Sequence, residues 1–426
     1  MSAVVAAGCH ETAEAAAEVL RAGGNAVDAA VAGSFAAFVA EPLLASAGGA
    51  GILTVALPDR PPAEVDFFSP APGFGAPPDE PDFVAVPIDF GSATQTFHIG
   101  RASVAPPLAL DGLTLASRRL GRLPLLDTLT PAIEMAQRGV RVGKEGALVY
   151  SLLWPIQAHS EATRALAGGG VPDEDTRLAN PDLAALLEEV ARHGGSPPSF
   201  DEALLRDFGP HAGGLLTRAD LDAAVPRVGA PRRVDLGAWT VLTSTRPGGA
   251  ALGAIVRRLI EDPSVLEEAA HVARVAEACR HGHAARTLDA RGSTTHLSVI
   301  DHEGGAAAVT LTNGEGCGYV ATGTGVQPNN FLGEEDLNPA GFHQHPAGDA
   351  LPTMVAPTIA TLRGTPRFVL GSGGSNRIRS VVAQVLHRLV QGEPLQDAVL
   401  RPRVHAEDDD VWVELTGRRA PDAIRA

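Results

Sequence analysis

Two runs of strand-forming residues lie close together in the last third of the chain and are separated by a short turn sequence. Residues 294–300 form the first run, residues 301–305 the turn, and residues 306–312 the second run. This pattern predicts an antiparallel β-hairpin. With the turn centred on Glu303, Thr294 lies opposite Thr312, and residues paired in this way have Cβ atoms about 4.5–5.5 Å apart. The hairpin constrains the fold because it fixes which side chains share a face.

Thr294 begins the first run and follows the small, flexible pair Gly292-Ser293. A threonine inside a chain is a weak nucleophile, but a threonine at a new N-terminus has its own base, because its α-amine accepts the hydroxyl proton. The pattern is therefore consistent with a masked nucleophile that cleavage between Ser293 and Thr294 exposes. From the residues alone, the alternative is an ordinary hairpin rich in threonine, a residue with high strand propensity.

Short motifs in a fixed order extend through almost the whole chain. They occupy residues 21–31, 41–42, 46–51, 121–124, 131–136, 294–299, 329–330, 354–358 and 371–377. In this order and spacing they resemble the γ-glutamyltransferase family, also called γ-glutamyltranspeptidases or glutathione hydrolases. Members of this family are N-terminal-nucleophile hydrolases that cut themselves to expose a catalytic threonine. The resemblance extends from residue 1 to about residue 417.

The resemblance implies roles in a catalytic centre. Thr294 matches the family's nucleophile, and Thr312 matches the threonine whose hydroxyl supports it. Gly373 and Gly374 match paired glycines whose N–H groups bind the oxyanion of the tetrahedral intermediate, which suits glycine because its backbone approaches a ligand closely. Without the family context, these glycines are a flexible turn between a strand at residues 368–370 and a helix that begins near Ile378.

The resemblance also implies contacts with the substrate. Glu334 aligns with the acid that binds the substrate α-amine, Thr353 stands near the family's pair of serines, and Ser375 adjoins the paired glycines. The family's asparagine just past the second threonine is Gly314 in this chain, with Asn313 one position earlier. We therefore predict that Glu334, Asn313, Thr353 and Ser375 contact the substrate.

Phe68 departs from the family pattern. The matching segment of relatives carries an arginine that binds the α-carboxylate of the glutamyl group. A phenyl ring cannot form the paired, charge-assisted hydrogen bonds of a guanidinium. A γ-glutamyl substrate then loses one anchor unless Arg101 or Arg377 replaces it. The alternative is an apolar pocket lined by Phe68, which suits a different acyl group.

Two further departures concern the frame of the protein. The linker between a helix at residues 270–278 and Thr294 is short, which can strain the scissile bond or restrict the separation of the new ends. The chain also stops soon after a strand at residues 411–415, where relatives run on through further strands, and residues 416–426 do not resemble a strand. Missing strands expose a sheet edge, so a truncated, unstable or inactive product is an alternative.

The resemblance implies an α+β fold, namely the four-layer αββα sandwich of N-terminal-nucleophile hydrolases, with both arms of the hairpin inside it. We predict one domain over residues 1–426, cleaved into a large subunit (1–293) and a small subunit (294–426) that stay together as a heterodimer. Helices are expected at residues 11–20, 26–40 and 252–261, strands at 52–57 and 236–244, and a helical region at 109–208.

Composition excludes several partners. The formal net charge of −16 argues against a nucleic-acid partner, which requires a basic surface. Cys9, Cys279 and Cys317 are too few and too scattered for a disulfide framework. The close histidine pairs, at positions 281 and 283 and at 343 and 345, lack the further ligands of a metal site, so we expect no metal and no cofactor. No secretory leader precedes the first motif and no apolar stretch is long enough to cross a membrane, which predicts a cytoplasmic protein.

The predicted function is that of a γ-glutamyltransferase-like threonine amidohydrolase or transpeptidase. After self-cleavage, Thr294 attacks a γ-glutamyl amide such as glutathione, and water or the amine of an amino acid or peptide resolves the acyl-enzyme. One alternative is an acylase for a different side-chain amide, of glutaryl or cephalosporin type. The other alternative is a non-cleaving, non-catalytic relative that acts only as a binding protein.

Overall fold

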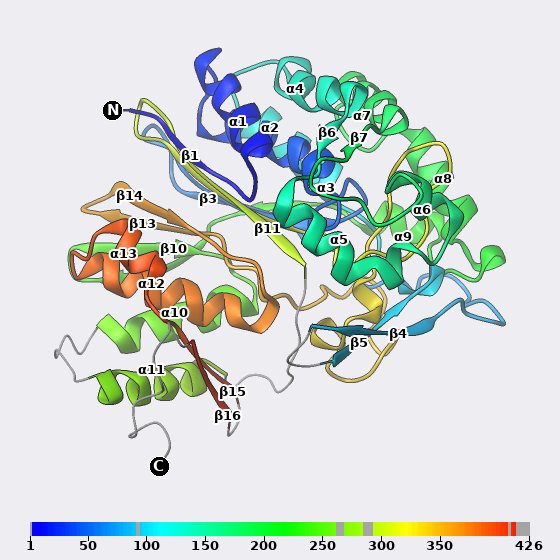
Figure 1. Ribbon diagram of the computed structural model, residues 1–426. Helices are drawn as coiled ribbons and strands as arrows, with labels where there is room; N and C mark the ends of the chain where they lie inside the picture. Colours follow the sequence, from blue (N-terminus) through cyan, green and yellow to red (C-terminus); the bar gives the residue numbers. More distant parts are fainter. Residues whose placement is uncertain (1, 91–93, 261–267, 284–292, 408–409, 415–426) are drawn as a thin grey trace.

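The hairpin of the sequence analysis is present in the computed structural model of the protein, which describes residues 2–90, 94–260, 268–283, 293–407 and 410–414 (Figure 1). Strands β11 (Thr294–Ile300) and β12 (Ala306–Thr312) are antiparallel, with Thr294 opposite Thr312 and Ile300 opposite Ala306. The predicted register is confirmed. The predicted short linker, through residues 284–292, and the tail at residues 416–426 lie outside the described residues.

The hairpin belongs to a six-stranded sheet in which paired strands are antiparallel. The strand order is β1 (Val4–Ala6), β11, β12, β2 (Ala50–Ala56), β3 (Ala63–Phe67) and β8 (Arg227–Gly229). Every residue of β2 and β12 is buried. These two central strands are therefore covered on both faces, unlike strands of a sheet that has one face in water.

A second sheet of four strands faces the first. Its order is β14 (Thr365–Leu370), β13 (Thr358–Leu362), β10 (Trp239–Thr243) and β9 (Arg232–Leu236). The two sheets meet through Ala56, Ala306 and Ala308 from the first sheet and Leu242 and Ile359 from the second. β13 and β14 contact β12, so the segments that follow these strands lie near the hairpin.

Helices pack against the outer face of each sheet (Figure 1). On the first sheet lie α1 (His10–Arg21), α2 (Ala26–Ala40) and α3 (Ala109–Leu120). Behind them, α4 (Leu125–Arg138) packs against α2, and α7 (Pro181–His193) packs against α4. On the second lie α10 (Pro247–Ile260) and α12 (Ile378–Val390), and α11 (Glu268–His283) packs against α10. Residues 26–38 of α2 are all buried, which explains why this helix is apolar all round rather than amphipathic.

Smaller elements complete the described part of the chain. The other helices are α5 (Gly143–Gln157), α6 (Glu161–Leu166), α8 (Pro198–Phe208), α9 (Arg218–Ala223) and α13 (Leu395–Leu400), with 3₁₀ turns η1 (Arg101–Ser103), η2 (Pro210–Ala212), η3 (Phe331–Gly333), η4 (Glu335–Leu337) and η5 (Ser375–Arg377). Three two-stranded sheets are β4 (Val84–Asp89) with β5 (Thr94–Ile99), β6 (Val140–Arg141) with β7 (Arg177–Leu178), and β15 (Val404–Glu407) with β16 (Asp410–Val413). None of the described helices is both long and apolar enough to cross a membrane.

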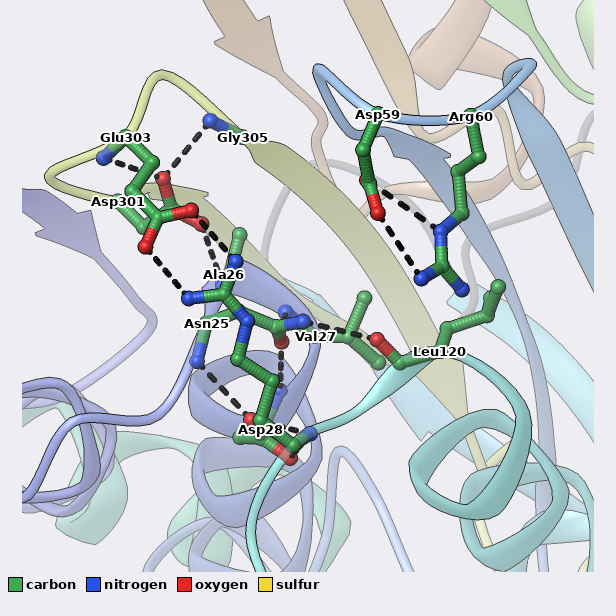
Figure 2. A network of polar contacts seen from close by, with 11 residues as sticks. Asn25, Ala26, Val27, Asp28, Asp59, Arg60, Leu120, Asp301, Glu303 and Gly305 are labelled. Carbon is green, nitrogen blue, oxygen red and sulfur yellow. Dashed lines mark hydrogen bonds and ion pairs between the residues drawn. The ribbon is translucent and has the colours of Figure 1, made fainter.

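A buried carboxylate fixes the turn of the hairpin. Asp301 is 4% exposed and accepts hydrogen bonds from the N–H groups of Glu303 (2.9 Å) and Gly305 (2.8 Å) within the turn (Figure 2). It also accepts from the N–H of Ala26 (2.9 Å) at the start of α2, where the helix dipole favours a negative charge. Asp301 therefore joins the turn to α2 and holds the hairpin at the end opposite to Thr294.

The motif at residues 21–31 forms the cap of α2. The Asn25 side chain accepts from the N–H groups of Val27 (2.9 Å) and Asp28 (3.0 Å) and donates to the carbonyl oxygen of Leu120 (2.8 Å) (Figure 2). The Asp28 carboxylate in turn accepts from the N–H of Asn25, which completes a capping box, and from the N–H of Arg122. Burial raises the pKa of Asp28. The motif thus joins α2 to the end of α3.

Substitution of Asp301 by Asn tests the role of this carboxylate. The amide group places an NH₂ donor against at least one of three backbone N–H donors, so we expect the free energy of unfolding to fall by about 1–3 kcal/mol. Asp59→Asn is the matched control, because Asp59 belongs to an exposed ion pair with Arg60 and surface pairs contribute little. Urea unfolding midpoints measure both variants, and equal midpoints would contradict the role of Asp301.

Candidate active site

Thr294 and Thr312 lie opposite each other at the open end of the hairpin, next to the peptide bond between Ser293 and Thr294. The Thr312 hydroxyl donates a hydrogen bond to the carbonyl oxygen of Ser293 (2.7 Å) and accepts one from the N–H of Gly314 (3.1 Å). Thr294 is half-buried and Thr312 is buried. A donor therefore already points at the carbonyl group that a nucleophilic attack by Thr294 would convert to an oxyanion.

A glycine-rich loop after β14 lies directly against β11. A Cβ atom at Gly373 would stand 2.5 Å from the carbonyl oxygen of Thr294, and one at Gly371 would stand 2.1 Å from Nδ1 of His296. Only residues without a side chain permit this approach. Gly374 has a positive φ of 107° and its carbonyl oxygen accepts from the N–H of Arg377 (3.1 Å). The loop therefore brings backbone groups beside Thr294, as the motif predicts.

Ser375 connects this loop to a second segment of the site. Its hydroxyl donates to Oδ2 of Asp336, and the Asn376 amide donates to the other oxygen of the same carboxylate (3.3 Å). Asp336 is 6% exposed and lies in η4. The structure thus gives Ser375 a hydrogen bond to the protein, which positions the glycine loop; its predicted contact with substrate stays a prediction.

Glu334 lies close to the backbone just past Thr312. A Cβ atom at Gly314 would stand 2.2 Å from Oε1 of Glu334 and 2.1 Å from Oδ1 of Asn330, so these side chains fill the place where an asparagine side chain would lie. Oε1 is buried and has no hydrogen-bond partner among the described residues. Burial, followed by the charges of Glu315 and Asp336, raises the pKa of Glu334 well above its ordinary value. An ammonium group placed here would provide both a donor and a compensating charge.

Glu315 is a member of the site that the sequence analysis missed. Its carboxylate accepts from the N–H (2.9 Å) and from the hydroxyl (2.6 Å) of Ser293. The residue is 2% exposed, and burial raises its pKa to about 7. The turn at Gly314, with a positive φ of 59°, brings this side chain back toward the start of β11. The one sequence feature that could have indicated this role is the position of Glu315 directly after Asn313-Gly314, a pair typical of turns.

Asn313 and Thr353 make their contacts elsewhere. Asn313 directly follows β12, and its amide donates to the carbonyl oxygen of Gln327 (3.2 Å), whereas its Oδ1 is buried without a hydrogen-bond partner among the described residues. The predicted contact of Asn313 with substrate stays a prediction. Thr353 is buried. Its carbonyl oxygen accepts a hydrogen bond from the N–H of Gly248 (3.0 Å), and its hydroxyl accepts one from the N–H of Val355 (3.3 Å).

Phe68 lies in a hydrophobic core rather than on a surface that faces solvent. It is 3% exposed and its ring stacks on Phe331 with centroids 5.2 Å apart. Both rings belong to a cluster that includes Leu332, Leu337 and Leu351. No guanidinium can occupy this position without displacing that packing, so the departure from the family's arginine is built into the core.

The arginines near this region have different partners. Arg101 forms an ion pair with Asp82 (2.8 Å) and lies over the ring of Tyr319. Arg246, which the sequence analysis did not single out, forms a two-point ion pair with Asp66 (2.7 and 3.1 Å), two residues before Phe68. Arg377 lines a cleft of about 330 Å³ together with Ser372 and Gly373. Of the two predicted replacements for the missing arginine, Arg377 is therefore the one beside the glycine loop.

Glu41, the first residue of the motif at residues 41–42, anchors the opposite face of β11. Its carboxylate is 7% exposed and accepts from the hydroxyls of Thr295 (2.7 Å) and Thr12 (2.6 Å). Glu41 directly follows α2, where carbonyl groups disfavour a negative charge, so the two donors stabilise it. Burial, followed by the charge of Glu41, raises the pKa of the Cys9 thiol to about 12, so this thiol is not a reactive thiolate.

His296 joins β11 to the second sheet. Nδ1 lies 2.8 Å from the Thr310 hydroxyl and Nε2 lies 3.1 Å from the Ser298 hydroxyl, which donates to the carbonyl oxygen of Val369 (3.0 Å) in β14. Burial lowers the pKa of His296 to about 3, so the ring is neutral at physiological pH. Within the described residues, no group of three or more His, Cys, Asp or Glu side chains is arranged to hold a metal ion.

Comparisons with known proteins find relatives that match almost the whole chain. Residues 12–291 and 287–423 match the family model for gamma-glutamyltranspeptidase. The chain is 29% identical to the acylase ACY 1 proenzyme of Pseudomonas sp. (strain V22), over 93% of this chain and 81% of that protein. It is 27% identical to the glutathione hydrolase proenzyme of Pseudomonas aeruginosa, over 94% and 82%. It superimposes on cephalosporin acylase from Bacillus halodurans with a TM-score of 0.76 at 20% identity, over 95% and 83% of the two chains.

Alanine at the two loop glycines tests their close approach to β11. Gly371→Ala and Gly373→Ala place a methyl group against His296 and Thr294, so each should lower the free energy of unfolding by about 1–3 kcal/mol, as overpacking does. Gly229→Ala is the control, because a Cβ atom at Gly229 meets nothing within 4 Å. Thermal or urea unfolding measures all three variants, and a loop variant as stable as the control would refute the tight packing.

The pH dependence of stability tests the neutral state of His296. In the unfolded chain a histidine has a pKa of about 6.5, whereas in the folded protein burial lowers the pKa of His296 to about 3. Between these values only the unfolded chain binds the proton, so stability falls as the pH falls. Relative to His296→Gln, the wild type should lose up to about 1.4 kcal/mol per pH unit below about pH 6. Urea unfolding at several pH values measures this, and parallel curves for both proteins would contradict it.

Proposed function

The chain belongs to the gamma-glutamyltranspeptidase family, and the relatives named above are enzymes. We propose that it is a self-cleaving threonine amidohydrolase or transpeptidase with Thr294 as nucleophile. Cleavage between Ser293 and Thr294 yields fragments 1–293 and 294–426, which remain together because β11 and β12 lie between strands of the first fragment. Several relatives carry the word proenzyme in their names, which agrees with processing.

One observation carries this proposal. The carbonyl oxygen of Ser293 accepts a hydrogen bond from Thr312, which lies opposite Thr294, while Gly373 of the glycine loop touches Thr294. A hydroxyl next to the scissile carbonyl and a loop of backbone donors beside the nucleophile are the parts that acyl transfer needs.

The fold we propose is the four-layer αββα sandwich of N-terminal-nucleophile hydrolases. Three sets of contacts support it: α2 and α3 pack on the first sheet, the two sheets pack on each other, and α10 and α12 pack on the second sheet. The superposition on cephalosporin acylase supports a fold shared with that protein.

The mature site performs acyl transfer in two steps. The free α-amine of Thr294 takes the proton of its own hydroxyl, and the hydroxyl oxygen attacks the carbonyl carbon of an amide substrate. The N–H groups of Gly373 and Gly374 stabilise the oxyanion, the amine leaves with the proton, and an ester with Thr294 remains. Water resolves the ester in hydrolysis, and the amine of an amino acid or peptide resolves it in transpeptidation.

A γ-glutamyl amide of the glutathione type is the substrate that we propose first. Glu334 supplies a buried carboxylate oxygen without a partner among the described residues, next to the backbone that follows Thr312, and this suits the α-ammonium of a glutamyl group. Arg377, beside the glycine loop, is the residue that we propose for the carboxylate in place of the family's arginine.

An acylase for a glutaryl- or cephalosporin-type side chain is the second candidate. The packing of Phe68 against Phe331 removes the arginine position altogether, and two of the relatives reported above are named acylases. An acyl group without an α-amine leaves Glu334 without its cation, so the acidic side chain distinguishes the candidates.

Mutation of Thr294 and Thr312 tests the proposed function. Wild type should yield fragments of which one begins Thr-Thr-His-Leu, and Thr294→Ala should stay intact, whereas Thr294→Ser retains a hydroxyl and should cleave slowly. Thr312→Val should slow cleavage about 100- to 1000-fold, because one donor to the oxyanion is lost. Intact mass and N-terminal sequencing measure the products.

A panel of γ-glutamyl and N-acyl chromogenic amides then separates the candidates. Turnover of γ-glutamyl substrates that Glu334→Gln abolishes supports the first candidate, and activity on acyl substrates alone supports the acylase. A wild-type chain that stays intact would instead favour the non-catalytic binding protein.

A further inference from the structure

Ser293 is held by three hydrogen bonds, although it contributes no group to the mature nucleophile. Its carbonyl oxygen accepts from the Thr312 hydroxyl, and its N–H and hydroxyl both donate to the carboxylate of Glu315, at 2.9 and 2.6 Å. The three bonds fix the peptide unit on both sides of the Ser293 α-carbon. A residue that precedes a strand would otherwise keep much of its backbone conformational freedom.

Burial of the Glu315 carboxylate costs free energy. The residue is 2% exposed, and a buried carboxylate requires hydrogen-bond donors or a cation to offset its lost hydration. Among the described residues, both donors to its side chain belong to Ser293, and its charge acts on the neighbouring acid Glu334. The energetic cost of this carboxylate is therefore offset chiefly by its contact with the residue before the scissile bond.

We propose that Glu315 is a positioning residue for self-cleavage, which holds Ser293 so that its carbonyl carbon faces the Thr294 hydroxyl. This inference rests on the proposed function. Thr312 and Glu315 divide the work: Thr312 binds the oxygen that becomes the oxyanion, and Glu315 fixes the rotation of the residue that carries it. Holding reacting groups in register removes an entropic cost from the barrier.

The covalent step conserves all atoms without a further reactant except water. The bond between Oγ1 of Thr294 and the Ser293 carbonyl carbon forms, the peptide C–N bond breaks, and the hydroxyl proton ends on the departing nitrogen. Water then hydrolyses the ester and leaves a carboxylate on Ser293 and the free hydroxyl on Thr294. Glu315 does not touch the reacting atoms of Thr294 and accepts hydrogen bonds throughout.

Glu315 also favours the release of the new chain end. After hydrolysis, Ser293 carries a carboxylate next to the carboxylate that held it, and two like charges at this separation repel each other strongly in a poorly hydrated site. The end of the first fragment then leaves, and the space beside Thr294 becomes available to substrate. One acid thus fixes the precursor and disfavours the retention of the cleaved end.

The test measures self-cleavage of the full chain after cell-free synthesis, in wild type and in Glu315→Gln, over a range of pH. The amide has one acceptor oxygen instead of two, so cleavage should slow roughly tenfold or more. In wild type, the rate should fall as the pH drops below about 7, the pKa of Glu315, because the protonated acid cannot accept from both donors. In Glu315→Gln the rate should not change in this window, which a purely structural role would not produce.

Two further variants complete the test. Glu335→Gln is the matched control, since Glu335 is exposed in the same acidic segment, and it should cleave like wild type. Ser293→Ala keeps Glu315 but removes one of the two donors, so it should cleave several-fold more slowly and decides the question where Glu315→Gln fails to fold. Wild-type rates with a wild-type pH profile in Glu315→Gln, or a wild-type rate in Ser293→Ala, would overturn the positioning role while leaving the nucleophile intact. A wild-type chain that never cleaves overturns the proposed function, and the role of Glu315 with it.

Discussion

The register of β11 against β12 is the constraint on which the rest of the site depends. A shift of one residue would turn every side chain of a strand to the other face and separate Thr294 from Thr312. The register is fixed at the far end, where Asp301 accepts three backbone N–H groups from the turn and from α2, and along both sides, where β1 and β2 pair with the hairpin. The site therefore stands on buried backbone rather than on mobile side chains.

The two faces of β11 then receive different chemistry from this one register. Thr294 and His296 point toward the second sheet and meet the glycine loop, whose residues lack the side chains that would block this approach. Thr295 points to the helices and is held by Glu41.

The sequence predicts those parts of the site that local rules govern. The hairpin, its register and the cap of α2 follow from turn residues, strand propensity and capping preferences, and the glycine loop follows from a motif. The sequence does not predict contacts between distant segments: the stacking of Phe68 on Phe331, the ion pair of Arg246 with Asp66 and the grip of Glu315 on Ser293. Each of these contacts depends on how elements far apart in the sequence pack together, and local sequence patterns do not predict that packing.

The acidic side chains near Thr294 limit which substrates the proposed enzyme would bind. Glu315 and Asp336 both lie near Glu334, and burial, followed by the charges of these two acids, raises the pKa of Glu334. A cation next to Glu334 removes both costs at once, so binding energy increases for substrates that carry an ammonium group on this side. An acyl group that ends in a carboxylate is repelled by these acids unless its carboxylate reaches Arg377 beside the glycine loop. In the proposed enzyme, the position of the substrate's charges relative to Glu334 therefore distinguishes a γ-glutamyl amide from an acyl group without an α-amine.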